Sequence, residues 1–157
     1  MRGSAVRVPG TAVYLGSPRG LVPRTLLHNV KHNKVVHSWV FLVQVETLEV
    51  PRLSSDERTE VQVLGEGVVR IVARYGFMGY PDIPRLLGRL SIPGWTYNPM
   101  EITYFLGRET CVVSSRRWYV RLRKQLFVLL HRNVHQDSDY YRLPPNRVVE
   151  LGTQIRL

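Results

Sequence analysis

The chain has 157 residues, 44% of them hydrophobic and 22% charged, so we expect one globular domain with its own core. Lysine and arginine number 22 against 12 acidic residues, and the net charge of +10 favours an anionic partner such as nucleic acid or a lipid surface. The one cysteine, Cys111, excludes an internal disulfide and fits a reducing compartment. No apolar run approaches the roughly 18 residues of a transmembrane helix. Residues 1–6 show no secretory signal and are expected to be a tag or a disordered start.

The first third of the chain predicts a βαβ unit. Residues 11–16 (TAVYLG) are typical of a buried strand. Pro23 suits the first turn of a helix, and apolar residues at helical spacing follow it. Residues 38–50 are β-branched and aromatic and end before Pro51, which predicts a second strand. A strand, a helix and a strand in this order form a right-handed crossover.

The rest of the chain predicts a hairpin, two helices and two more strands. Two runs that alternate apolar and polar residues flank the turn GEG at 65–67. The later elements are a short helix that starts at Pro81 and Asp82, a strand over 101–107, a helix over 114–133 and a final strand over 148–155. The predicted fold is therefore α/β: a single domain with a mixed sheet of about five or six strands and about three helices.

The segment HNVKHNKVVH, residues 28–37, holds three of the five histidines. His28 and His32 are four residues apart and would share one face of a helix, which is a spacing that can bind a metal. No third and fourth ligand accompanies them in a known motif. We therefore interpret the segment as the end of a helix, with cations beside the negative end of the helix dipole and Asn33 in the left-handed cap position.

No catalytic motif is present, and we expect neither an enzyme nor a cofactor. There is no GxSxG elbow, the carboxylates are scattered, and Cys111 lies in an apolar setting that raises a thiol pKa. The turn GSPRG joins the first strand to the first helix, where a phosphate group can bind. Gly16, Ser17 and Gly20 are thus weak candidates for a nucleotide site, although the turn is neither GxGxxG nor a P-loop.

The predicted helix at 114–133 is strongly basic and has no acidic residue. Its apolar stripe suits packing against the core, and its cations can face solvent, anionic lipid headgroups or nucleic acid. No helix-turn-helix, RNP or KH signature supports nucleic acid, so we do not expect that partner. The residues proposed to face a membrane or a partner are Arg116, Arg117, Arg121, Arg123 and Lys124.

Five short motifs carry a resemblance to a known family. RVPGTAVYLGS, LLHNVKHNKVVH, RIVARYGFM, YFLGRET and LPPNRVVELGTQI occur in this order between Arg7 and Ile155. Together they resemble the C-terminal cytoplasmic region of the Kup-type (KUP/HAK/KT) bacterial potassium uptake transporters. The resemblance covers nearly the whole chain and implies that residues 7–157 form one cytoplasmic C-terminal domain.

The resemblance implies a parent protein that carries K⁺ inward across the bacterial inner membrane, coupled to protons. The ion path would lie in transmembrane helices that this chain lacks, so no K⁺ site and no metal site is assigned here. The expected role is regulation or assembly of the transporter, through its transmembrane part, a second copy of the domain or the anionic membrane surface. His28, Asn29 and Lys31 are candidates for contact with the membrane part. The alternative role is sensing of a nucleotide or a cyclic dinucleotide, since some relatives of such transporters respond to cyclic dinucleotides.

Overall fold

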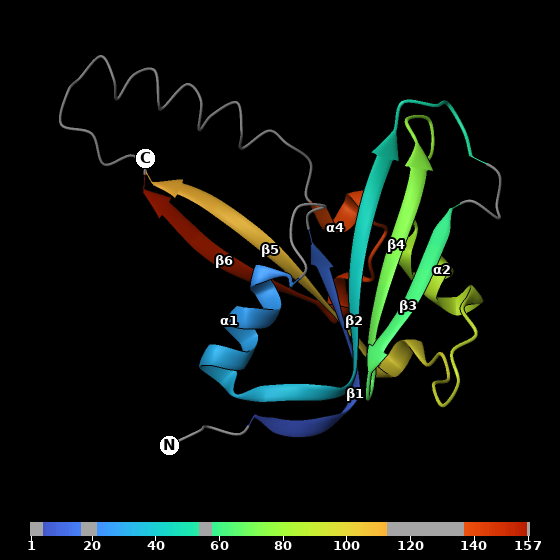
Figure 1. Ribbon diagram of the computed structural model, residues 1–157. Coiled ribbons are helices and arrows are strands. Elements are labelled where there is room, and N and C mark those ends of the chain that lie inside the picture. Colours follow the sequence, from blue (N-terminus) through green and yellow to red (C-terminus); the bar gives the residue numbers. More distant parts are fainter. Residues whose placement is uncertain (1–4, 17–21, 54–57, 113–136, 157) are drawn as a thin grey trace, which may run out of the picture.

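The computed structural model describes residues 5–16, 22–53, 58–112 and 137–156. They form one six-stranded sheet with the strand order β3-β4-β2-β1-β5-β6, in which β3 is antiparallel to β4 and the other neighbours are parallel. The predicted α/β class with a mixed sheet is confirmed (Figure 1). The elements are β1 (Val6–Gly16), α1 (Arg24–Asn33), β2 (Val35–Leu48), β3 (Thr59–Gly65), β4 (Val68–Gly76), α2 (Ile83–Arg89), η2 (Pro99–Glu101), β5 (Ile102–Val112), α4 (Asp137–Tyr140), η3 (Pro145–Arg147) and β6 (Val148–Arg156).

The βαβ unit and the hairpin are confirmed, and β1 is longer than predicted. β1 and β2 pair in parallel on either side of α1, and β3 and β4 form the hairpin. β1 starts at Val6 rather than at residue 11, because a register shift between Val8 and Thr11 lets the strand bend and continue. Gly10 lies in this bend with φ +102°, and a β-carbon there would come within 3.1 Å of the Glu101 carbonyl oxygen.

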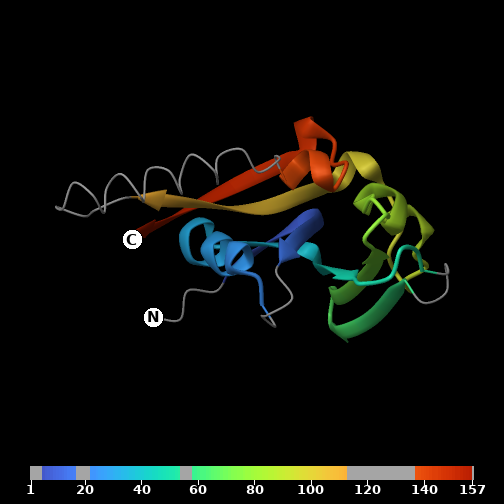
Figure 2. The same cartoon turned by 90° about the horizontal axis from the view of Figure 1, so that it is seen from above.

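The two faces of the sheet are covered by different elements (Figure 2). α2, Trp95 of the following loop and Leu143 pack on one face, over a cluster that contains Phe41, Ile71 and Tyr104. α1 packs on the other face, where Leu26 covers a smaller cluster around Tyr14, Leu42 and Phe105. The alternation of side chains along each strand divides these two clusters.

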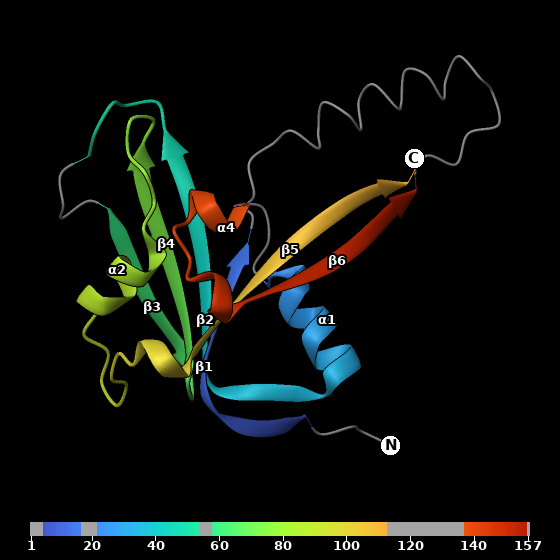
Figure 3. The same cartoon turned by 180° about the vertical axis from the view of Figure 1, so that it is seen from behind.

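The helix predictions have separate outcomes. The first two helices are confirmed: Pro23 precedes α1, and the Asp82 carboxylate caps α2 by accepting a hydrogen bond of 2.9 Å from the Arg85 amide. The basic helix predicted at 114–133 lies outside the described residues. Seen from behind, α4 lies close to the start of β6, beside the face that α2 covers (Figure 3). This short helix was not predicted.

Candidate functional site

The segment HNVKHNKVVH spans the last turns of α1 and the start of β2. Lys31 and His32 lie in the last turn, as the helix-end interpretation predicted. The prediction for the cap was wrong by one residue, because Lys34 rather than Asn33 has the left-handed conformation, with φ 55°. Asn33 remains helical, and its side-chain amide donates to Asn29 Oδ1 at 2.8 Å, one turn earlier.

The three histidines of this segment do not converge on one point. The rings of His28 and His32 stack with their centroids 5.8 Å apart, while His37 lies on β2 with its edge against Phe105. Within the described residues, no group of three or more His, Cys, Asp and Glu side chains is placed to hold a metal ion. Burial lowers the pKa of His37, and its Nδ1 atom is buried without a hydrogen-bond partner.

Asn29 is an internal residue of the domain. It is 4% exposed, and its Nδ2 donates to the Tyr14 hydroxyl at 2.9 Å and to the Val35 carbonyl at 3.0 Å. These bonds tie α1 to both strands of the βαβ unit. Of the three residues predicted to contact a membrane domain, Asn29 therefore has a structural role inside this fold. The contacts of half-buried His28 and exposed Lys31 stay a prediction.

The turn proposed for phosphate binding is described only at Gly16. This residue ends β1, and a β-carbon on it would lie 3.1 Å from the ring of Pro23 at the start of α1. Ser17 and Gly20 lie outside the described residues, and so do all five basic residues predicted to face a membrane or a partner. The nucleotide site and the membrane-facing helix thus stay predictions.

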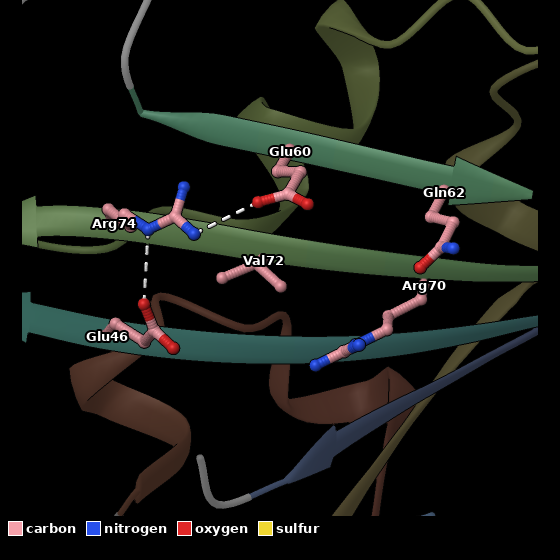
Figure 4. Close-up of a pocket in the computed structure, with 6 residues that line it drawn as sticks. All are labelled: Glu46, Glu60, Gln62, Arg70, Val72 and Arg74. Atoms are coloured by element: carbon pink, nitrogen blue, oxygen red, sulfur yellow. Dashed lines mark hydrogen bonds and ion pairs between the residues drawn. The ribbon is translucent and has the colours of Figure 1, made fainter. Parts of the chain in front are cut away.

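The structure assembles a charged face that the sequence reasoning missed. One face of the sheet holds six polar residues whose strand registers align: Gln44 and Glu46 of β2, Arg70 and Arg74 of β4, and Glu60 and Gln62 of β3. This face continues the one that α1 covers, beyond the reach of α1. We call these six residues the charged face. All of them except Gln44 line, together with Val72, a shallow pocket of about 100 Å³ (Figure 4).

Arg74 is the centre of the charged face. Its Nε lies 3.2 Å from Glu46 Oε2, and its Nη2 lies 3.0 Å from Glu60 Oε2, so it joins β4 to both neighbouring strands. The hydrogen bond to Glu60 raises the pKa of Arg74 above its already high ordinary value. Gln44 donates to Glu46 Oε1 at 2.7 Å. Because these groups are partly exposed, solvent screens both ion pairs and each contributes little to stability.

The pocket on the charged face is small beside the usual sites for cofactors. Sites for small molecules usually enclose about 300 to 1,000 Å³, several times the volume here. The two carboxylates and two guanidinium groups balance in charge, and Arg74 already bonds to both carboxylates. In the sequence, polar residues stand at alternate positions of each strand, as they do on an exposed face of a sheet. Only the pairing of the strands shows that these residues lie side by side.

The described residues form an α/β domain around one six-stranded mixed sheet, with the charged face on one side of it. Among the described residues, no helix combines the length and the apolar composition that a membrane span requires. The family model for the K⁺ potassium transporter C-terminal domain matches residues 9–157. The chain belongs to this family, as the motif resemblance predicted.

The curated relatives are named as potassium transport proteins. A Kup potassium transport system protein of Anaeromyxobacter sp. (strain Fw109-5) is 44% identical over 156 residues, which are 96% of this chain and 24% of that protein. The Kup protein of Myxococcus xanthus is 45% identical over 97% of this chain and 23% of its own length. The low affinity Kup protein of Klebsiella pneumoniae is 40% identical over 97% of this chain and 24% of its own length. The chain thus spans about a quarter of these relatives. No solved structure matches it.

Proposed function

We propose that this chain is the cytoplasmic domain of a potassium uptake transporter and serves its regulation or assembly. The observation that carries the proposal is the family match over residues 9–157, together with relatives about four times as long whose names state potassium transport. Uptake of K⁺ coupled to protons would belong to the missing part of the parent. The domain would act by contact with that part or with a second copy.

The charge of the chain supports a position on the cytoplasmic side. Segments next to the cytoplasmic membrane surface carry an excess of Lys and Arg, and the anionic lipids there attract them. The net charge of +10 and the single cysteine fit that side of the membrane. These features are general ones, so the function needs a direct test.

The test is a chimaera in the Klebsiella relative, which is 40% identical to this chain. In a strain without other K⁺ uptake systems, uptake from low external K⁺ is measured for the intact transporter, for a version without the matching segment, and for a version in which this chain replaces it. We expect the deletion to reduce uptake and this chain to restore it. Undiminished uptake after the deletion would contradict a role in regulation or assembly.

Two further measurements separate regulation from assembly. An immunoblot of the membrane fraction gives the amount of transporter, and dividing uptake by this amount gives the rate per molecule. A role in assembly predicts that the deletion lowers the amount, whereas a role in regulation predicts that it lowers the rate per molecule. The chimaera with Asn29→Ala serves as a control for folding, because this substitution removes the bonds that fix α1 to the sheet.

The proposed contact of residues 114–133 with the membrane has its own test. Sedimentation of the chain with vesicles of anionic lipid is compared with sedimentation with neutral vesicles. We expect binding to the anionic vesicles that weakens as salt is added, since each basic residue near the surface contributes about 1 kcal/mol. Substitution of Arg117 and Arg121 by Glu should reduce this binding. Equal binding to both kinds of vesicle would exclude the electrostatic contact.

A further inference from the structure

The outer edge of β3 has no neighbouring strand in the part of the chain that the structure describes. β3 stands at the end of the sheet and pairs only with β4 among the described strands. Exposed strand edges invite pairing with another chain, and proteins usually guard them with Lys, Pro or a very short strand. The sequence of β3, TEVQVLG, has no Lys and no Pro, and it is seven residues long.

Two apolar side chains on β3 extend the core beyond the edge of the sheet. Val61 lies opposite Ile71 and Val63 lies opposite Val69, on the face that α2 covers. Ile71 and Val69 are fully buried, whereas Val61 is 40% exposed and Val63 is 59% exposed. A further strand beside β3 would cover these two valines and continue the apolar face.

The backbone of β3 is arranged for such a strand. The Arg74 amide donates to the Arg58 carbonyl, so this pair marks a hydrogen-bonded position of the ladder between β3 and β4. In antiparallel pairs such positions alternate. Residues 60 and 62 therefore bond toward β4, and residues 59, 61 and 63 direct their amide and carbonyl groups to the open side.

We propose that β3 pairs in antiparallel fashion with β3 of a second copy of this chain, about a two-fold axis at Gln62. This register places Val61 of each copy opposite Val63 of the other. The backbone amide and carbonyl groups of both valines point to the open edge, so they can form hydrogen bonds with each other across the two-fold axis. The four valines then form one apolar row that joins the two cores. The proposal rests on the assembly role proposed above and assigns a surface to it.

The charges on β3 allow this self-pairing. Glu60 is the one ionisable side chain between residues 59 and 65, and its carboxylate already bonds to Arg74 at 3.0 Å. In the proposed register Glu60 lies diagonally across from Gln62 of the other copy, whose amide is a hydrogen-bond donor. No like charges lie directly opposite each other, and the strand is complementary to itself.

Disulfide formation tests the register. With Cys111→Ser as the background, Gln62→Cys places one cysteine on the two-fold axis. Residues opposite each other at a non-hydrogen-bonded position have Cα atoms about 4.5 Å apart, within the range that a disulfide spans. The matched control is Leu27→Cys on α1, where the native side chain is 57% exposed. Under mild oxidation we expect covalent dimers of the first variant at several times the level of the second. Equal levels would overturn the proposal.

A second experiment needs no cysteine. Analytical ultracentrifugation over a range of concentrations compares the native chain with Val63→Lys and with Val149→Lys, which places the same charge on β6 at the opposite edge of the sheet. We expect Val63→Lys to raise the dimer dissociation constant at least about tenfold, because the ammonium group would enter the apolar row. Val149→Lys should leave it unchanged.

The two experiments keep the proposal separate from the proposed transport role. The pairing is overturned if the native chain stays monomeric at all concentrations and the Gln62→Cys variant forms no covalent dimer. That result would not affect the uptake measured for the chimaera. A dimer that responds to Val149→Lys rather than to Val63→Lys also overturns the pairing, by moving the interface to β6. Circular dichroism of each variant confirms that the chain is folded, and the cross-linking result stands even if Val63→Lys unfolds.

Discussion

Substitution of Asn29 by alanine should destabilise the domain far more than a typical change on a helix. Two groups would lose their donor: the buried Tyr14 hydroxyl at 2.9 Å and the partly buried Val35 carbonyl at 3.0 Å. An unsatisfied buried group costs about 1 to 3 kcal/mol and a typical lost hydrogen bond about 0.5 to 1.5 kcal/mol, so the two together cost about 1.5 to 4.5 kcal/mol. Asn33 is exposed, and water can replace its lost bond. The greater helix propensity of alanine returns about 0.5 kcal/mol. The expected loss is therefore about 1 to 4 kcal/mol, a large part of the roughly 5 to 15 kcal/mol that stabilises a domain.

Urea unfolding followed by circular dichroism measures this loss, and Leu27→Ala on the same helix is the control. Leu27 is 57% exposed, so its substitution should cost no more than about 0.5 kcal/mol. A double-mutant cycle with Tyr14→Phe gives a sharper test. Alone, Tyr14→Phe removes a hydrogen bond and should destabilise by about 1 kcal/mol. In the Asn29→Ala background it should be neutral or stabilising, because it removes a hydroxyl that has no partner. A loss below about 1 kcal/mol for Asn29→Ala, or additive effects in the cycle, would refute the reasoning.

Three further outcomes are expected. Burial raises the pKa of Tyr14 to about 12 from 10 in the unfolded chain, so the contribution of Tyr14 to stability should be lost between pH 10 and pH 12, by about 3 kcal/mol. Burial also raises the pKa values of Tyr75 and Tyr104, so Tyr14→Phe should lessen but not abolish the decline above pH 10 in urea titrations. Burial lowers the pKa of His37 below 6.5, so protonation favours the unfolded chain; stability should fall as the pH drops below about 6.5, and less so in His37→Phe. Thr11→Val removes the acceptor 3.0 Å from the buried Trp95 indole nitrogen and should cost about 1 to 3 kcal/mol by urea unfolding, whereas an unchanged midpoint would show that this bond contributes nothing.

Local sequence patterns predicted the strands and the first two helices of this fold. The contacts between elements depend on residues far apart in the sequence, and these patterns did not predict them. Periodicity and turn residues were sufficient for the βαβ unit and the hairpin, because each depends on neighbours in the sequence. The bond between Trp95 and Thr11 joins residues 84 positions apart, and no local pattern encodes it. Asn29 was predicted as a candidate for contact with the membrane part of the transporter, and the structure places it in the interior of the domain. It is buried because Tyr14 of β1 supplies a polar partner beneath α1.

The charged face shows the same limit for the candidate site. Glu46, Glu60 and Arg74 lie on three strands, and in each strand they fit the ordinary alternation of an exposed face. Their meeting depends on two registers, Glu46 with Arg74 and Glu60 with Val72, that a single sequence does not give. Had the strand order been known, the period-two positions would have been sufficient to find the face.

The distribution of charge separates the surfaces that the domain can offer to a membrane and to a protein. The charged face holds two carboxylates and two guanidinium groups, so its net charge is zero, although the chain as a whole carries +10. β3 adds no charge beyond Glu60, which belongs to this face. The positive excess therefore lies elsewhere in the chain, and attraction to anionic lipid has no reason to turn this half of the sheet toward a membrane. The neutral face and the apolar edge of β3 suit the proposed contact with a second copy of the chain. The proposed membrane binding and the proposed self-association would thus depend on different residues, and substitution should remove either one without loss of the other.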